Sequence, residues 1–316
     1  MSHSPNRIDV HTHMIPAFWA EAMGTDSPVP EPDWDLESAI AMMDRLGIRV
    51  GVISLPTPAV TTFHGQARID MTRKINAFGM DLVKKGKGRV GYFVTVPMPD
   101  VEATLVELRR VYEQHHEIDG VILITNYSGV YLGDPKFAPV WDELERHQTV
   151  VFVHPAVPEI EPIPGMMTAV VDFPLDTTRM AVNLVVSGVT SRCPSVKIIL
   201  AHAGGFLPFA ATRFAVLLAN TSMKDKSVEY ITGQLKSFYL DTALSTPDAL
   251  PSLLAWAKPD HILFGSDNPY ITSEQQQFFT DKLDQYKEFR PRQLEMINSE
   301  NAEAIFPRLR MTSAST

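Results

Sequence analysis

The hydrophobic positions of the chain alternate between short apolar runs and longer stretches with a helical period. Between Val101 and Tyr112, apolar side chains recur at intervals of four, three and four residues, which places them on one stripe of an α-helix. Several of the short runs are apolar throughout, as is typical of parallel strands buried on both faces. We predict strands at Arg7–Val10, Val50–Leu55, Val90–Val94, Gly120–Ile124, Val150–Val153, Lys197–Leu200, Phe238–Asp241 and Ile262–Phe264. Eight strands that alternate with helices favour a (β/α)8 TIM barrel, with a doubly wound sheet as the alternative.

Two proline-rich stretches interrupt this alternation and predict long loops. Gly24–Asp35 follows the first strand and contains Pro28, Pro30 and Pro32. Pro155–Pro174 follows the fifth strand, contains five prolines and shows no clear period. In a barrel both loops lie at the C-terminal face, where long loops commonly cover or wall a pocket. Neither an internal repeat nor a linker divides the chain, so we expect all 316 residues to form one barrel domain.

The charge balance and the single cysteine narrow the class of protein. The 28 Lys and Arg residues against 37 Asp and Glu residues give 28 − 37 = −9, without a dense basic run, so we expect no nucleic-acid partner. Cys193 is alone, which excludes a disulfide within the chain and a cysteine-based zinc knuckle. The first residues lack the apolar core of a secretory signal, and no uninterrupted apolar run approaches the ~20 residues of a membrane span. We therefore expect a cytoplasmic protein without a membrane partner.

The strongest local signal for chemistry is the pair His11 and His13 at the end of the first strand. Residues two apart in a strand share a face, so both imidazoles point to the barrel interior. This arrangement suits two nitrogen ligands on one metal ion. The alternative is two histidines that are satisfied by hydrogen bonds at a strand end.

Three further strands end in a residue of the same kind. His154 follows the fifth strand, His202 the sixth and Asp267 the eighth. The C-terminal ends of barrel strands meet on one face, and buried imidazoles or carboxylates are costly unless they are paired or bind a metal. Imidazole and carboxylate ligands without thiolate point to a borderline divalent ion such as Zn²⁺ or Mn²⁺.

This set of strand ends resembles the amidohydrolase superfamily. The matching motifs are His-x-His, the fifth-strand histidine, His-Ala-Gly-Gly on the sixth strand and Gly-Ser-Asp on the eighth. Within the superfamily the chain is similar to the metal-dependent decarboxylases typified by aminocarboxymuconate semialdehyde decarboxylase, and most of all to fungal 6-methylsalicylate decarboxylases. The stretches that carry the resemblance to the semialdehyde decarboxylase branch are Phe173–Arg179, Pro194–His202 and Gly205–Phe209. The resemblance runs from about Ile8 to about Phe306.

The resemblance implies a ligand set and a catalytic histidine. It implies that one divalent metal per chain is bound by His11, His13, His154 and Asp267. No lysine ends the fourth strand, where a bridge between two metals would require one, so a single metal is implied. The His-x-His start favours zinc, with manganese as the alternative. It also implies that His202 handles protons or activates water beside the metal, and that Asp267 takes part in catalysis.

The resemblance and the positions of several residues indicate candidates around the substrate. Arg213 matches an arginine that reaches a neighbouring subunit's substrate, which implies a homodimer or homotetramer, although a solvated arginine on a helix face is the alternative. Arg179 is a second candidate, unless it pairs with Asp176. Asp241 is interpreted as a carboxylate that orients a ligating histidine. The expected pocket walls are Phe173, Asn126, Tyr127 and Phe206.

We therefore expect a metal-dependent, non-oxidative decarboxylase of a small carboxylic acid, with 6-methylsalicylate or a related salicylate as the best guess. The proton would reach the ring carbon from Asp267 with His202 as relay, or His202 would activate a water that adds to the substrate. Two alternatives remain. A hydrolase or lactonase would drive water onto a carbonyl with the same groups and release no CO2. A barrel without catalytic activity would hold no metal.

Overall fold

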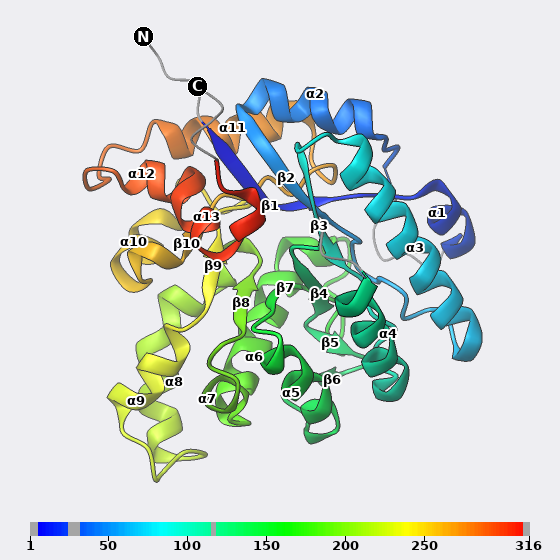
Figure 1. Cartoon of the computed structure of the whole chain (residues 1–316). Helices are drawn as coiled ribbons and strands as arrows, with labels where there is room; N and C mark the ends of the chain where they lie inside the picture. Colours follow the sequence, from blue (N-terminus) through cyan, green and yellow to red (C-terminus); the bar gives the residue numbers. More distant parts are fainter. Residues whose placement is uncertain (1–5, 25–31, 115–117, 312–316) are drawn as a thin grey trace.

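A closed barrel of eight parallel strands forms the centre of the molecule (Figure 1). The computed structural model describes residues 6–24, 32–114 and 118–311. The strands follow the order β1-β2-β3-β4-β7-β8-β9-β10, and each pairs in parallel with the next. The last and first strands close the ring, because Val10 donates to Phe264 O (3.0 Å) and His13 donates to Asn268 O (2.7 Å). The predicted (β/α)8 barrel is confirmed.

The elements have the following bounds. The barrel strands are β1 (Arg7–His13), β2 (Ile48–Ser54), β3 (Val90–Val94), β4 (Gly120–Ile124), β7 (Val150–His154), β8 (Lys197–Leu200), β9 (Tyr239–Asp241) and β10 (Ile262–Leu263). The helices are α1 (Ala17–Met23), α2 (Leu36–Leu46), α3 (Gly65–Lys85), α4 (Val101–Gln114), α5 (Ala138–Arg146), α6 (Asp172–Val186), α7 (Val189–Arg192), α8 (Leu207–Asn220), α9 (Val228–Leu235), α10 (Leu250–Trp256), α11 (Ser273–Asp284), α12 (Gln293–Glu295) and α13 (Asn301–Ile305).

The strand side chains divide into an inner and an outer core. In β7, Val150 and Phe152 belong to the cluster inside the barrel, whereas Val151 and Val153 pack outward among the helices. Phe306, just after α13, joins the inner cluster and closes the barrel at the N-terminal end of its strands. Side chains therefore fill the barrel interior below the C-terminal ends of the strands, and a ligand site is expected at that end.

An irregularity in β1 aims the histidine pair. Ile8 and Val10 belong to the inner cluster, and strict alternation would then turn His11 and His13 outward. The pairing of β1 with β2 shifts register between Asp9 and Thr12, however, and this break lets Val10 and His11 both face the interior. A regular strand was predicted here. The predicted inward orientation of His11 and His13 is correct, but it is the bulge that produces it.

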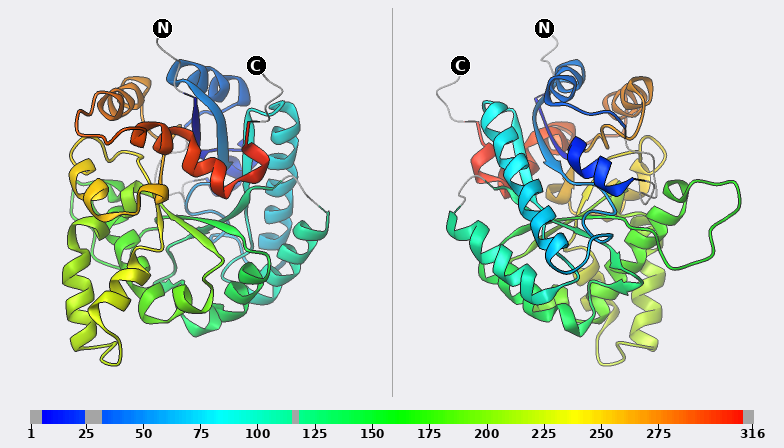
Figure 2. Two further views of the ribbon diagram at one scale, coloured as in Figure 1. Left: turned by 60° about the vertical axis from the view of Figure 1, so that its left-hand side comes forward. Right: turned by 90° about the vertical axis from the view of Figure 1, so that its right-hand side faces the viewer.

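The eight predicted strands all occur, and the differences lie in the loops. A short hairpin of β5 (Asn126–Tyr127) and β6 (Val130–Tyr131) after β4 was not predicted. Most of the predicted loop Gly24–Asp35 lies outside the described residues. The segment after β7 extends away from the barrel (Figure 2, right) and contains one 3₁₀ turn, Thr168–Val170. Helix α6 begins at Asp172, so Pro174 stands in its first turn, where proline removes no hydrogen bond.

Candidate metal centre and active site

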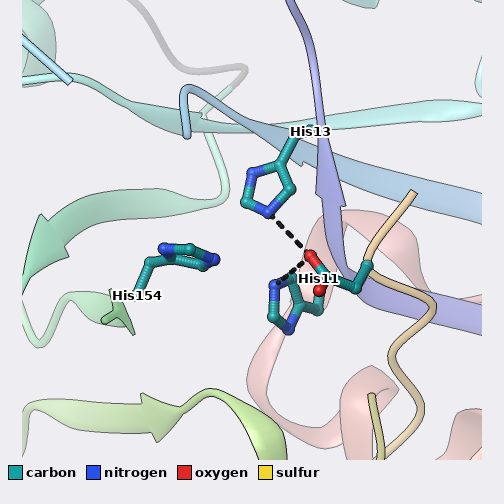
Figure 3. A group of neighbouring side chains, drawn as sticks. His11, His13 and His154 are labelled. Atoms are coloured by element: carbon teal, nitrogen blue, oxygen red, sulfur yellow. Dashed lines mark ion pairs between the residues drawn. The ribbon is translucent and has the colours of Figure 1, made fainter. Parts of the chain in front are cut away.

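Four side chains converge at the C-terminal ends of three strands. His11 and His13 come from β1, His154 ends β7, and Asp267 follows β10 (Figure 3). One potential ligand atom from each residue lies within 4.8 Å of those of the other three, and all four residues are buried. Oδ1 of Asp267 lies 3.1 Å from His11 Nε2 and 3.3 Å from His13 Nε2. The structure thus brings together the four residues for which metal binding was predicted.

Each histidine is oriented through its other ring nitrogen. His11 Nδ1 lies 2.8 Å from Asp241 Oδ2. An ionised carboxylate accepts hydrogen bonds and cannot donate them. His154 Nδ1 lies 3.0 Å from the carbonyl oxygen of Pro155. His13 Nδ1 lies 3.1 Å from Ser54 Oγ. A partner on Nδ1 holds the ring so that Nε2 faces the cluster, which is the usual support of a ligating histidine.

The donor atoms of this cluster fit a divalent metal ion. His11 Nε2, His13 Nε2 and Asp267 Oδ1 are buried and make no hydrogen bond among the described residues. Buried polar atoms without a hydrogen bond are costly, and coordination of one cation would satisfy all three together. Imidazole nitrogens with one carboxylate oxygen are ligands that zinc and manganese accept.

The electrostatics of the cluster also favour a cation. Burial alone would lower the pKa of His11, but the carboxylates of Asp241 and Asp267 raise it to about 10. Burial likewise opposes ionisation of Asp267, yet the charge on His11 and the nearby rings of His13 and His202 hold its pKa well below the usual value. Burial, together with the neighbouring histidines, pushes the pKa of His154 well below its usual value. One positive charge is therefore stabilised here, and a metal can replace the proton that otherwise supplies it.

His202 stands beside the cluster without being part of it. Its Nε2 lies 3.2 Å from Asp267 Oδ2, the carboxylate oxygen that faces away from His11 and His13. The backbone N–H of His202 donates to Asp241 Oδ1 (2.9 Å), so one carboxylate positions both this loop and His11. His202 and Asp267 both have positive φ, +55° and +59°, which costs energy for a side chain with a Cβ. These backbones are held in place by the surrounding contacts.

Close packing behind the cluster depends on Gly265 and Asp9. A Cβ at Gly265 would lie 2.9 Å from His11 Cβ and 3.2 Å from Asp241 Cβ, so only glycine lets the strand end approach. Asp9 is fully buried and accepts hydrogen bonds from the backbone N–H and the hydroxyl of Ser266 and from the N–H of His11. Burial raises the pKa of Asp9 to about 7. Asp9 thereby ties β1 to the loop that carries Asp267.

A cavity of about 650 Å³ opens above the cluster. His154, His202 and Asp267 form its floor, and Phe173 and Phe206 stand in its wall, as predicted for these two aromatic residues. Most of the remaining wall is apolar, from Met167, Ala169, Val170, Pro174, Pro208, Phe209, Leu244, Ala249 and Ile271. The size is that of a site for a small organic molecule.

Four residues with a predicted role at the substrate do not line this cavity, namely Asn126, Tyr127, Arg179 and Arg213. Asn126 and Tyr131 both donate to Asp176, and the Arg179 guanidinium lies 5.4 Å from the centre of the Tyr131 ring. This buried network fixes the β5–β6 hairpin against α6, so Asn126 and Arg179 support the wall from behind. Arg213 is exposed on α8, and no described residue forms an ion pair with it. Tyr127 packs in the core outside the barrel, and none of the four lines the cavity of its own chain.

Several lining residues escaped the sequence reasoning. Leu244, Ser245, Asp248 and Ser252 come from the segment after β9, and Tyr270 from the loop after β10, with its ring 5.5 Å from that of His13. The signal that could have found them is positional. Every loop that follows a barrel strand opens on the same face, whatever its composition.

Comparison with known proteins decides the family. The amidohydrolase family model matches residues 8–308 of the chain. The chain belongs to the amidohydrolase family. This amidohydrolase is 35% identical to a decarboxylase, macB, of Penicillium terrestre, over 97% of the chain and 96% of the relative. It is 32% identical to the 6-methylsalicylic acid decarboxylase acuB of Aspergillus aculeatus, over 98% of each.

Solved structures share the fold at lower sequence identity. One is the 5-carboxyvanillate decarboxylase LigW2 of Novosphingobium aromaticivorans, with bound manganese and a nitrobenzoic acid derivative. It superimposes with a TM-score of 0.84 at 21% identity, and the match covers 96% of this chain and 97% of that one. At this identity the likeness shows the shared barrel.

Proposed function

We propose that this amidohydrolase is a metal-dependent, non-oxidative decarboxylase of a hydroxylated aromatic carboxylic acid of the salicylate type. The observation that carries the proposal is the cluster of His11, His13, His154 and Asp267 below a largely apolar cavity, with His202 on the other oxygen of Asp267. The similarity over nearly the full length to a 6-methylsalicylic acid decarboxylase supports 6-methylsalicylate as a substrate to test first.

One divalent ion per chain would be held by His11, His13, His154 and Asp267. When bound, it supplies a Lewis acid for the carboxylate and the ortho hydroxyl of the substrate. We propose zinc because three imidazoles and one carboxylate suit it. Manganese is the alternative, supported by its presence in a decarboxylase of the same fold.

Side chains of the protein would deliver the one proton that the reaction requires. Loss of CO2 directly from an aromatic ring would leave an aryl carbanion. His202 Nε2 and Asp267 Oδ2, 3.2 Å apart, can share a proton and deliver it to the ring carbon that bears the carboxylate. The electron pair of the C–C bond then returns to the ring, which regains aromaticity as CO2 leaves. The sum is one proton taken up and one CO2 released, without an oxidant or a reductant.

The test is the product balance of metal-loaded enzyme with 6-methylsalicylate. We expect equal amounts of CO2 and 3-methylphenol, and loss of both after chelation with recovery on addition of zinc or manganese. Hydrolysis of a lactone or amide panel without any CO2 from salicylates would instead establish the hydrolase alternative.

We also propose that the active unit is a homodimer in which a second copy covers α8. Phe209, Val216 and Leu217 are exposed on this helix, and Arg213 lies among them. The segment His202–Asn220 has a mean hydropathy of 1.2 with 28% of it buried, so by length and composition it could also cross a membrane. Because α8 packs against α9 and α10 as a barrel helix and carries an arginine at mid-length, a protein partner fits it better.

Mixed chains test the place of Arg213 in this dimer. Arg213→Ala chains are mixed with His202→Ala chains, each of low activity alone. If Arg213 serves the partner's site, mixed dimers contain some intact sites, and activity partly returns. No recovery in mixed dimers confirmed by mass spectrometry confines Arg213 to its own subunit, and near-normal activity of Arg213→Ala removes it from the site. A Phe209→Ser chain that sediments as the wild-type species would contradict the α8 interface.

A further inference from the structure

The cavity has two chemically different parts. Its floor holds the carboxylate of Asp267 and the rings of His154 and His202, where the reacting carboxylate must lie. Above the floor the walls are largely apolar. Met167 and Val170, just before α6, and Phe206 and Phe209, at the start of α8, contribute to them.

The volume of the cavity exceeds what a methyl-substituted ring requires. A space of about 650 Å³ falls within the range of roughly 300–1,000 Å³ in which proteins enclose drug-sized molecules. A single benzene ring anchored by its carboxylate at the floor would leave most of the apolar wall in contact with water. Apolar wall that stays wet contributes nothing to the binding of a substrate.

The charges around the cavity exclude another acidic group on the substrate. Among the described residues no lysine or arginine lines the cavity, and Arg179 and Arg213 both lie outside its wall. The lining carboxylate other than Asp267 is that of Asp248, for which no hydrogen bond or ion pair is found among the described residues. A second carboxylate would therefore lose its hydration without gaining a cation from its own chain and would approach a negative charge. Arg213 is then expected at the α8 interface and not in the partner's cavity.

We infer that the substrate is a monocarboxylic salicylate whose ring carries an apolar group larger than methyl, an alkyl chain or a second ring. This group lies against the apolar wall that includes Met167, Val170, Phe206 and Phe209. The inference rests on the proposed decarboxylation and adds to it the part of the substrate that does not react. The cavity wall thus favours a long apolar substituent on the ring and disfavours a charged one.

A matched set of three substrates tests the inference on the metal-loaded wild-type enzyme. They are 6-methylsalicylate, 6-pentylsalicylate, and the same pentyl chain with a terminal carboxylate. Each buried methylene improves binding by roughly fourfold, so partial burial of the longer chain should raise kcat/KM by about tenfold or more over the methyl compound. We expect the carboxylated chain to lose about tenfold or more relative to the pentyl chain. A preference for the methyl compound, or equal turnover of the two long substrates, overturns the inference.

A pair of variants on α10 connects the preference to the cavity. Ser252 lines the cavity, and Ala255 is exposed on the same helix outside it. We expect Ser252→Phe to lower the ratio of kcat/KM for the pentyl over the methyl compound by about tenfold. Ala255→Phe introduces the same ring and should leave this ratio at the wild-type value. Equal ratios in both variants, with melting temperatures that show both are folded, contradict a tail in this cavity.

The two levels of the proposal fail in different ways. If no salicylate of the set releases CO2 from metal-loaded enzyme, the decarboxylase assignment is wrong. If CO2 is released but the methyl compound is preferred, the decarboxylase assignment stands and the extended apolar substrate is wrong.

Discussion

The floor of the cavity and its rim, the apolar residues around the opening, differ in burial and polarity. On the floor, His11 and His13 are fully buried, and the Nδ1 atom of each meets a defined partner within about 3.1 Å. On the rim, Val170 is 59% exposed and Phe209 is 86% exposed, and both present apolar surface to the opening. The floor comes from strand ends, whereas the rim comes from a long loop and the first turns of α6 and α8.

This difference separates the reaction from the choice of substrate. Strand ends in a closed barrel can hold reacting groups to fractions of an ångström because their backbones are hydrogen-bonded on both sides. Loops above them can change without disturbing that geometry, so they determine which molecule fits. Changes to the floor should therefore abolish turnover of every substrate, and changes to the rim should alter the ratios between substrates.

The largest expected effect follows from removal of a floor ligand. His11→Ala should lose most of its metal and reduce decarboxylation to background, because the cluster then keeps one imidazole of the β1 pair and Asp241 Oδ2 loses its partner. Elemental analysis of the purified variant checks this. His64→Ala removes an exposed histidine before α3 and should retain both metal and activity. Full metal content in His11→Ala would show that the cluster is not the metal site.

His202→Ala should separate metal binding from catalysis on the same floor. His202 contacts the outer oxygen of Asp267 and is not among the four clustered residues, so the metal should stay. The rate should fall by about 10²–10⁴-fold, the usual contribution of a positioned acid–base group. Metal analysis and kcat are measured on one preparation. Loss of metal together with the rate would mean that His202 is a ligand.

Sequence reasoning succeeded on the floor for a physical reason. His154 and Asp267 each end a short apolar run, and strand period together with barrel topology is enough to place such residues on one face. The bulge in β1 was not predicted, because it accompanies contacts such as Ser266 with Asp9 across the closure of the barrel. Such a contact joins residues that are far apart in the chain.

The rim was predicted less well because loops carry no period. Asn126 was expected at the substrate, but the β5–β6 hairpin turns it toward Asp176. Asp248 and Ser252 gave no signal, since a polar residue after a short strand is common anywhere. Two expectations stay predictions: zinc in preference to manganese, and a cytoplasmic location. Neither the metal nor the location changes which residues face the cavity.

An intermediate effect is expected at the layer that supports the floor. Asp241→Asn keeps the shape of the side chain but removes the charge that holds His11 Nδ1 at 2.8 Å. Loss of such a carboxylate typically lowers metal affinity or activity by about 10–100-fold. The pair of Asp260 with His261 Nδ1, at 2.9 Å on the surface, offers a matched control. Asp260→Asn should change neither metal affinity, measured by competition with a chelator, nor kcat. Equal effects of the two changes would show that Asp241 acts only on folding.

The smallest effect is expected on the rim at Asp248. This carboxylate is exposed in the cavity wall, so solvent screens it and its removal should matter little for neutral tails. Asp248→Asn should raise kcat/KM for the salicylate with a carboxylated pentyl chain by roughly two- to fivefold, the scale of one exposed charge interaction. The gain should shrink as salt is added, because screening weakens the repulsion that the substitution removes. Asp225→Asn removes an exposed carboxylate outside the cavity and should leave the ratio of carboxylated to plain pentyl substrate unchanged. A salt-independent gain, or the same gain in Asp225→Asn, would mean that the rim does not select against charge through Asp248. The contrast between a catalytic floor and a selective rim would then rest on the apolar wall alone.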